Sequence, residues 1–342
     1  MKRLKPILLI SLLLFVLSGF SQADSVAPEK KVRKPVINPW YSSMLIDQQT
    51  SFLPAKGGIE FVIHHRFTAI ESGITDLFGF YGASNIRLGL NYSITNRLMI
   101  GFGSEKDRKD QEFLIKYKIL EQSRDGSMPI SLLLYANTCI NSKDQEYFGI
   151  NYTFKDRLSY FSQLIVSRKW TENLSTLIAF SYAHINKVES FRVETADTIA
   201  TTITYYPKFY NDAIGATIAG RYRIGNTFSI IAEFEQGFAF NINGGNGNGD
   251  GDGDGDGDGD GDGDGDGEEE DNLKAISSGI PNRQTPKPNL SVGMEIATMT
   301  HSFQMFVSSY RGIIPQNNLI MNNFDFTKKS GIMVGFNVIV KF

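Results

Sequence analysis

The stretch from Gly331 to the terminal Phe342 alternates strictly between two kinds of side chain. One set is wholly apolar and consists of Ile332, Val334, Phe336, Val338, Val340 and Phe342. The other set includes glycine, asparagine and lysine and consists of Gly331, Met333, Gly335, Asn337, Ile339 and Lys341. Because successive side chains of a strand point to opposite faces, this pattern predicts a strand with one apolar face.

The same period of two recurs along the chain and predicts about twelve strands of roughly ten residues each. They are expected near 57–67, 84–93, 97–104, 110–120, 129–138, 157–169, 174–185, 212–223, 227–238, 288–299, 302–311 and 331–342. So many strands in one chain predict an all-β fold, and their single apolar face favours a transmembrane antiparallel β-barrel.

The predicted connections alternate in length. Those on the side where the chain starts are mostly tight, at 94–96, 121–128, 170–173, 224–226 and 300–301. Those on the other side are mostly long, at 68–83, 105–109, 139–156, 186–211, 239–287 and 312–330. Short periplasmic turns and long external loops are typical of outer-membrane barrels. An even number of strands places the N- and C-termini on the same, periplasmic side.

A soluble β-sandwich or a periplasmic lectin-like domain would also show alternating strands. Such a fold would bury its apolar face and expose charged side chains. Here the polar face is rich in glycine and mixed in charge, while the apolar face carries aromatic residues near strand ends, including Trp170, Phe228, Tyr182 and Phe238. This distribution fits the aromatic girdles of a membrane barrel, which is therefore the favoured fold.

The chain begins with a pattern typical of a secretory signal peptide, predicted over residues 1–23. Three bases within the first five residues precede an apolar stretch from Ile7 to Phe20, and Ala23 closes a cleavage-site pattern. A membrane anchor is the alternative, but the stretch is shorter than the roughly 20 apolar residues that a spanning helix needs. We therefore expect export to the outer membrane of a Gram-negative bacterium.

Several phrases in order along the chain carry a family resemblance. They are FVIHHRF (61–67), DLFGFYGASNIRLGLNYSITNRLMIGFG (76–103), IKYKILEQ (115–122), SYAHIN (181–186), GMEIATMTHSFQMFVSS (293–309) and GFNVIVKF (335–342). Over about residues 40–342 the chain resembles an uncharacterised family of Bacteroidetes outer-membrane β-barrel proteins, a domain of unknown function. The resemblance implies a single barrel and no established activity. The chain departs from that pattern at Met299-Thr300, where glycine is usual before His301, and in an inserted Gly-Asp run.

The ending on Phe342 resembles the C-terminal signal of bacterial outer-membrane barrels. It implies recognition by the barrel-assembly machinery, with outer-membrane lipid as the other expected partner.

The candidate catalytic residues do not form a site on the strand map. The four histidines are His64, His65, His184 and His301. His301 lies at a turn on the starting side, and the first and seventh strands lie on opposite sides of a twelve-stranded barrel, so no three histidines can share a metal. Ser181 and His184 are three residues apart, which puts them on opposite faces of a strand. We expect no enzyme activity and no cofactor.

The polar face supplies the candidate site, a set of charged residues that should line the lumen. They are Glu60, Arg66, Arg87, Lys116, Lys118, Arg221, Arg223, Glu233, Glu235 and Glu295. We expect ion pairs across a narrow interior, and alternatively Arg87, Arg221 and Arg223 could favour anionic solutes.

Residues 24–56 are expected to form a periplasmic N-terminal segment ahead of the barrel at 57–342. Our hypothesis is that the partly apolar stretch 38–57 acts as a plug under or inside the lumen. A filled lumen would favour a docking role, whereas an open one would favour transport.

The run from Asn246 to Asp271 carries thirteen acidic residues and no base, although the formal charge of the whole chain is only −3. Asp258, Asp260, Asp262 and Glu269 match the spacing of an EF-hand calcium loop. The match is weak because any alternating Gly-Asp string produces it, and no amphipathic helices flank it. We expect residues 244–271 to be a disordered external loop with at most loose binding of divalent cations.

The sequence thus predicts an outer-membrane barrel that serves as a passive pore or a structural barrel. One alternative is a surface-binding or partner-docking barrel that acts through its external loops, and another is an enzyme with a site in the lumen. Nucleic acid is not an expected partner, because no basic cluster lies in a soluble recognition fold. The pattern of residues does not set the oligomeric state.

Overall fold

A computed structural model of the protein describes residues 34–71, 73–149, 151–196, 201–240 and 282–342. The predicted signal peptide at 1–23, the acidic loop at 244–271 and its calcium candidates Asp258, Asp260, Asp262 and Glu269 lie outside these described residues. From Pro35 onward, the described residues form one compact unit. None of the described helices is long and apolar enough to cross a membrane.

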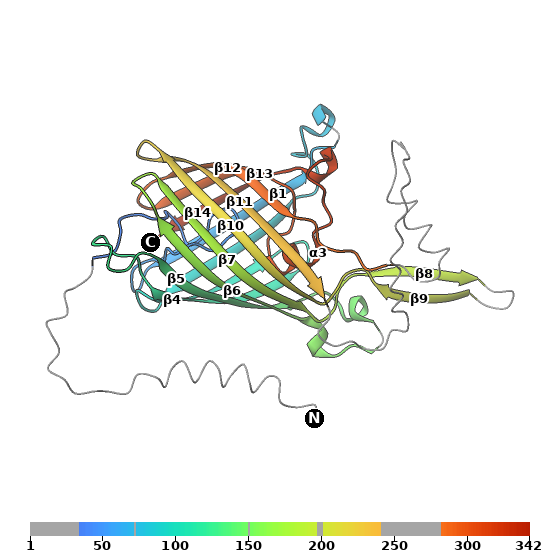
Figure 1. The fold of residues 1–342 in the computed structure, drawn as a ribbon. Coiled ribbons are helices and arrows are strands. Elements are labelled where there is room, and N and C mark those ends of the chain that lie inside the picture. The colour runs from blue at the N-terminus through green and yellow to red at the C-terminus, as the bar shows by residue number, and fades with distance from the viewer. Residues whose placement is uncertain (1–33, 72, 150, 197–200, 241–281) are drawn as a thin grey trace, which may run out of the picture. The chain divides into compact units, whose positions relative to one another are not determined.

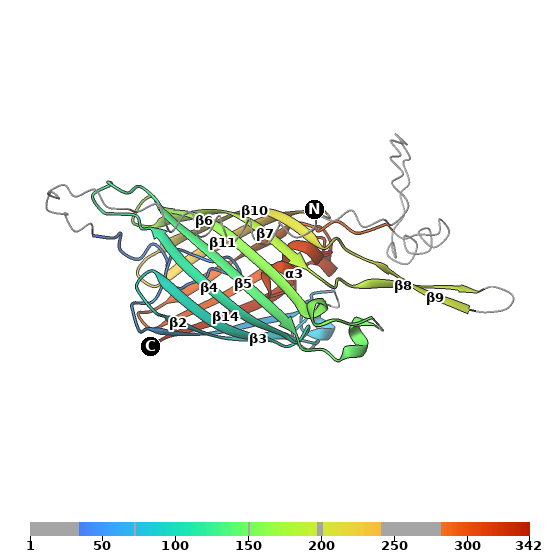
Figure 2. The same ribbon diagram turned by 90° about the horizontal axis from the view of Figure 1, so that it is seen from below.

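Twelve antiparallel strands close into a barrel in the order β1-β14-β13-β12-β11-β10-β7-β6-β5-β4-β3-β2 (Figure 1; seen from below in Figure 2). The strands are β1 (Ile59–Ala69), β2 (Asn85–Ser93), β3 (Leu98–Glu105), β4 (Asp110–Leu120), β5 (Ser131–Asn141), β6 (Leu158–Lys169), β7 (Leu174–Ile185), β10 (Asp212–Ile224), β11 (Phe228–Phe240), β12 (Asn289–Ala297), β13 (His301–Ser308) and β14 (Met333–Lys341). Each corresponds to a strand predicted from the sequence, so the predicted fold class is confirmed.

Side chains alternate between the two faces of the wall as the period of two requires. In β2, Leu88, Leu90 and Tyr92 point outward and expose about half of their surfaces, while Arg87 and Asn91 point inward and are buried. Apolar side chains outside and polar side chains inside are the arrangement of a transmembrane β-barrel, in which lipid takes the place of a protein core.

The barrel closes between its first and last strands. Residues 60–66 of β1 pair in unbroken register with β14, from Glu60 opposite Lys341 to Arg66 opposite Gly335. The backbones of Ile59 and Phe342 exchange hydrogen bonds at 3.2 and 2.9 Å. Closure leaves no unpaired edge strand in the wall, which is the condition for exposing a sheet to hydrocarbon.

The connections differ between the two ends of the barrel. At one end, here named the turn end, the links are 94–97, 121–130, 170–173, 225–227 and 298–300, and Phe342 ends the chain there. At the other end, named the loop end, longer segments join the strands, as at 70–84, 142–157, 186–211 and 309–332. The asymmetry expected from the sequence is present.

The loops at the loop end contain secondary structure that the period of two did not predict. The connection at 186–211 holds a hairpin of β8 (Ser190–Ala196) and β9 (Thr201–Pro207), which form a separate two-stranded sheet. The helix α3 (Pro315–Met321) lies between β13 and β14. Four short 3-10 helices complete the described elements: η1 (Gly73–Asp76), η2 (Gln145–Phe148), η3 (Phe154–Arg157) and η4 (Lys329–Gly331).

Candidate functional site

The interior of the barrel is occupied by a segment that precedes β1, residues 40–53, here named the N-terminal plug. Trp40, Leu45 and Ile46 of the plug expose 1% of their surface or less. The plug folds back on itself as a tight hairpin, in which Leu45 N–H donates to Gln48 O (2.8 Å) and Thr50 N–H donates to Ser43 O (2.9 Å). Its tip is therefore the turn at residues 45–48.

The tip of the plug is held between a cation and an anion of the wall. Arg66 of β1 donates from Nη2 to both carboxylate oxygens of Asp47, at 2.8 and 2.9 Å. On the other side, the backbone N–H groups of Asp47 and Gln48 donate to the Glu233 carboxylate of β11, at 3.0 and 3.1 Å. Arg66 also lies with its guanidinium carbon 4.4 Å from the ring centroid of Phe306, a cation–π contact.

Further bonds join the plug to other strands. The Ser43 N–H and hydroxyl both donate to the Glu60 carboxylate of β1. Lys116 of β4 donates to Ser43 O at 2.6 Å, and Asn337 of β14 donates to Ile46 O at 2.7 Å. The otherwise orphaned backbone groups of this buried hairpin are thus satisfied by charged and amide side chains of the wall.

The chain is also fixed where it enters the lumen at the turn end. Val36 N–H donates to Gln122 O (3.0 Å), and Lys169 Nζ donates to Ile37 O (2.6 Å). Arg221 donates to Asn38 O at 2.8 Å and places its guanidinium 4.1 Å from the ring centroid of Tyr41. These bonds set the direction in which the plug enters.

From the loop end, α3 and its flanking residues fold back into the barrel. Leu319 and Ile320 are fully buried and belong to the same apolar cluster as Trp40 and Ile46 of the plug. Two glycines of the wall permit this approach: a Cβ on Gly215 would lie 2.5 Å from Leu319 Cδ1, and one on Gly237 would lie 2.4 Å from Leu319 O. The glycines on the inner face of β10 and β11 therefore form the surface against which α3 packs.

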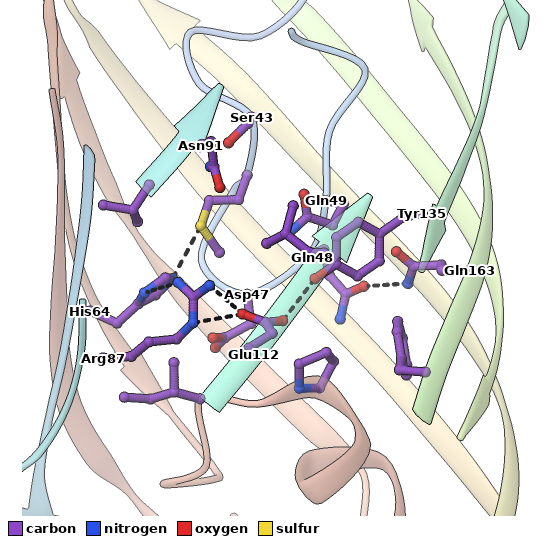
Figure 3. Close-up of a pocket in the computed structure, with 16 residues that line it drawn as sticks. Ser43, Asp47, Gln48, Gln49, His64, Arg87, Asn91, Glu112, Tyr135 and Gln163 are labelled. Atoms are coloured by element: carbon purple, nitrogen blue, oxygen red, sulfur yellow. Dashed lines mark hydrogen bonds and ion pairs between the residues drawn. The ribbon is translucent and has the colours of Figure 1, made fainter. Parts of the chain in front are cut away.

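The space left between the plug and the wall is small. A cavity beside the plug tip holds about 20 Å³, which is room for roughly one water molecule. Figure 3 shows the residues around it, with the plug tip facing His64, Arg87 and Glu112. Arg87 donates through Nε to Glu112 at 2.9 Å, and Tyr135 OH donates to the same carboxylate at 3.0 Å.

The predicted lumen residues have different partners. Glu60, Arg66, Lys116 and Glu233 bind the plug, and Arg221 binds the segment that leads into it. The remainder bind within the wall: Arg87 to Glu112, Lys118 to Glu121, Arg223 to Asn173, Glu235 to Asn289 and Thr217, and Glu295 to Ser302 and Gln304. Nine of the ten are buried, whereas Arg223 is partly exposed at the turn end.

Sequence reasoning missed three polar residues that matter here. Glu112 has the same strand parity as Lys116 and Lys118, so the alternation alone could have placed it in the lumen. Asn337 was assigned to the polar face of the last strand but not to the site. Asp47 carries no periodic signal, because its position depends on contacts with β1 and β11 that are distant in sequence.

The lumen also contains apolar side chains that belong to the wall itself. Leu133, Ile165, Leu177 and Ile231 point inward, expose 1% or less, and pack in one cluster with the plug and α3. An aqueous channel would expose these side chains to water at a cost of about 1.5–3 kcal/mol each. The interior is therefore packed like a protein core and does not form a water-filled channel.

The histidines do not converge on a common centre. His64 is buried in the lumen, where Arg87 approaches Nδ1 at 3.4 Å, while His301 lies at the turn end. His184 points outward and contacts Asp212 at 2.8 Å, whereas Ser181 points inward. Within the described ranges, no group of three His, Cys, Asp or Glu residues could hold a metal ion.

A closed barrel with an apolar exterior and a polar inner face defines this chain as a membrane β-barrel protein. Comparison with known families makes the assignment specific. The chain belongs to the family described as "Membrane bound beta barrel domain (DUF5777)", whose profile matches residues 41–342. The match starts at the N-terminal plug, so the family domain includes the segment that fills the lumen. None of the curated proteins matches this chain.

Solved structures to which the chain is similar include two porins. A NanC porin shares 9% identity with a TM-score of 0.40, and the comparison covers 83% of this chain and 98% of the porin. A KdgM porin shares 9% identity with a TM-score of 0.38 over 83% and 98% of the two chains. LpxR from Salmonella typhimurium shares 10% identity with a TM-score of 0.36 over 83% and 99%.

Proposed function

We propose that this protein is a closed barrel of the Gram-negative outer membrane that acts through its external loops as a docking protein. In this proposal the turn end and both termini are periplasmic, and the loop end is external. The supporting observation is the packed lumen, which the N-terminal plug enters from one end and α3 from the other. Such an interior does not conduct solutes unless the plug leaves.

The closed state rests on buried surface as well as on polar bonds. Trp40, Leu45 and Ile46 are buried against the wall, and each contributes about 1.5–3 kcal/mol through burial. The ion pair of Asp47 with Arg66 fixes the register of the tip, because a buried carboxylate without its cation is unfavourable. Release of the plug would break all of these contacts together.

Conductance across a planar bilayer tests this proposal. The full chain, folded and inserted, should show no steady ionic current. The variant W40A should show current, because it removes the largest buried side chain of the plug. W170A is the matched control, because Trp170 is exposed at the turn end and its indole N–H donates to Thr176 of β7. A steady current from the wild-type chain would refute the closed barrel.

A gated passage is the second candidate function. The polar contacts between the plug tip and the wall favour it. The tip is held by the ion pair between Asp47 and Arg66 and by backbone N–H bonds to Glu233. On release of the plug, these polar groups can form hydrogen bonds to water instead, whereas buried apolar contacts have no such replacement. Under this alternative, wild-type protein would be silent at first and would open in discrete steps when a periplasmic partner binds the N-terminal segment.

The remaining expectations are proposals of the same kind. Phe342 closes the last strand and leaves its ring exposed, where the barrel-assembly machinery could recognise it. Lipid covers the exterior, and the acidic run at 246–271 associates loosely with divalent cations. We propose no enzyme activity, no cofactor and no nucleic-acid partner for this chain.

A further inference from the structure

An apolar loop stands at the loop end between β1 and β2, at residues 73–82. It exposes five large apolar side chains within eight positions, namely Ile74, Leu77, Phe78, Phe80 and Tyr81. Ile74 and Tyr81 each expose 78% of their surface. A contiguous exposed group of this kind normally marks an interaction surface and not an ordinary solvated loop.

The loop holds these side chains outward at a conformational cost. Leu77 and Phe78 have φ angles of 51° and 57°, a left-handed conformation that bulky L-residues rarely adopt. Hydrogen bonds within the loop stabilise this strained conformation. Phe78 N–H donates to Gly73 O (2.6 Å), and Tyr81 N–H donates to Asp76 O (3.1 Å). The Asp76 carboxylate accepts from Gly79 N–H at 3.0 Å. The exposed apolar side chains are thus built into the structure of the loop.

The apolar loop is continuous with the lipid-facing exterior of the barrel. Phe80 packs against Phe67 of β1, with ring centroids 4.3 Å apart, and Phe67 packs against His65 at 4.4 Å. His65 stacks on Phe336 of β14 at 4.8 Å. Since Phe67, His65 and Phe336 point outward, these contacts extend the exterior onto the loop. In Figure 1 the loop, in light blue, projects sideways from the end of β1.

Cations lie at the base of the apolar loop. Lys106 Nζ donates to Ser84 O at 2.8 Å, and Arg311 approaches Ala83 O at 3.4 Å while it pairs with Asp107 at 2.8 Å. An apolar tip beside cations is the arrangement that suits an amphiphile with an anionic headgroup.

We infer that residues 73–82 insert into the outer leaflet of the membrane, with Ile74, Phe78 and Tyr81 among the lipid acyl chains. The loop then serves as an interfacial anchor that sets the depth of the barrel at its β1–β2 side. The inference goes beyond the docking function and rests on the membrane-barrel class together with the external position of the loop end.

Spin labels on the full chain in phospholipid vesicles test this inference. Cys139 is the only cysteine and is buried, so C139S gives a background without a native thiol. In that background, Y81C carries the label on the apolar loop, and I74C is a second, equally exposed site. Y205C is the matched control, because Tyr205 is a similarly exposed tyrosine in β9 of another loop. Retained heat-modifiable migration on gels verifies folding of each variant.

The measured quantity is the accessibility of the label to oxygen relative to a water-soluble nickel chelate. At positions 81 and 74 we expect high oxygen and low chelate accessibility, and at position 205 the reverse. Chelate accessibility at both 81 and 74 equal to that at 205 would show a loop in water and overturn the inference. Low accessibility to both reagents, or dipolar broadening between labels, would show a protein or a second copy on the loop and would also overturn it.

Discussion

The ion pair between Asp47 and Arg66 gives the sharpest test of how the plug is held. The side chain of Arg66 is fully buried and that of Asp47 exposes 5%. The variant D47A leaves the Arg66 guanidinium with Asn337 Oδ1 at 3.0 Å, His65 O at 3.2 Å and the face of Phe306 as partners. Removing one partner of a buried pair typically costs about 3–5 kcal/mol. D47A keeps the backbone N–H bonds from positions 47 and 48 to Glu233. The loss of stability should therefore come mainly from the loss of the ion pair.

Fluorescence of Trp40 can report release of the plug in the W170F background, since Trp40 and Trp170 are the only tryptophans. With a denaturant slope of about 2 kcal/mol per molar urea, a loss near 4 kcal/mol moves the midpoint down by roughly 2 M. D47N retains a hydrogen-bond acceptor and should lose roughly half as much, on the scale of a charge-assisted hydrogen bond. D144A, which removes an exposed loop carboxylate, is the control and should leave the midpoint unchanged.

The double variant D47L/R66M tests whether the loss of stability in D47A comes from the uncompensated charge of Arg66. Removing both charges should recover much of the stability that D47A loses, because a buried pair and an apolar pair are often close in free energy. If D47A unfolds at the midpoint of the parent, the ion pair does not hold the plug. If the double variant is less stable than D47A, the loss does not arise from an uncompensated charge.

Two further predictions concern the ends of the barrel. Hydrogen bonds from Ser123 and Ser127 lower the pKa of Asp125, in the exposed turn at 121–130, from 3.8 to about 2. The stabilisation they give is therefore present above pH 3.8 and is lost as the pH falls through about 2. The protection factor of the Ser127 amide, its exchange rate relative to the intrinsic rate at the same pH, should fall between pH 4 and pH 2, and D125N should abolish this fall; an unchanged fall in D125N would assign it to another group. Deletion of residues 246–271 should leave membrane insertion and heat-modifiable migration intact, and a barrel that fails to assemble without the run would contradict its accessory role.

The wall of the barrel was predictable because its signal is local. Alternation in a segment such as 331–342 fixes which side chains face outward, whatever the neighbouring strands are. The lengths of the connections then assign the two ends. Even the inward direction of Glu60, Arg66 and Lys116 follows from parity with their apolar neighbours.

The partners of those side chains were not predictable from the same signal. Phe306 lies on the inner, mostly polar face of β13, where it packs over Arg66 and fills the space that Gly335 leaves open. Parity gives the face on which a side chain lies. It does not say which group across the lumen meets that side chain.

The sequence by itself determined a twelve-stranded barrel with an apolar exterior, a polar inner face, short turns at one end and long loops at the other. Only the tertiary structure decided that the lumen is filled, that α3 closes it from the loop end, and that an apolar loop extends the exterior. The physical reason is the range of the interactions. The face to which a strand side chain points is set by its immediate neighbours in the sequence. Asp47, in contrast, bonds to Arg66, which is 19 positions away, and to Glu233, which is 186 positions away. Such contacts exist only once the wall has closed around them.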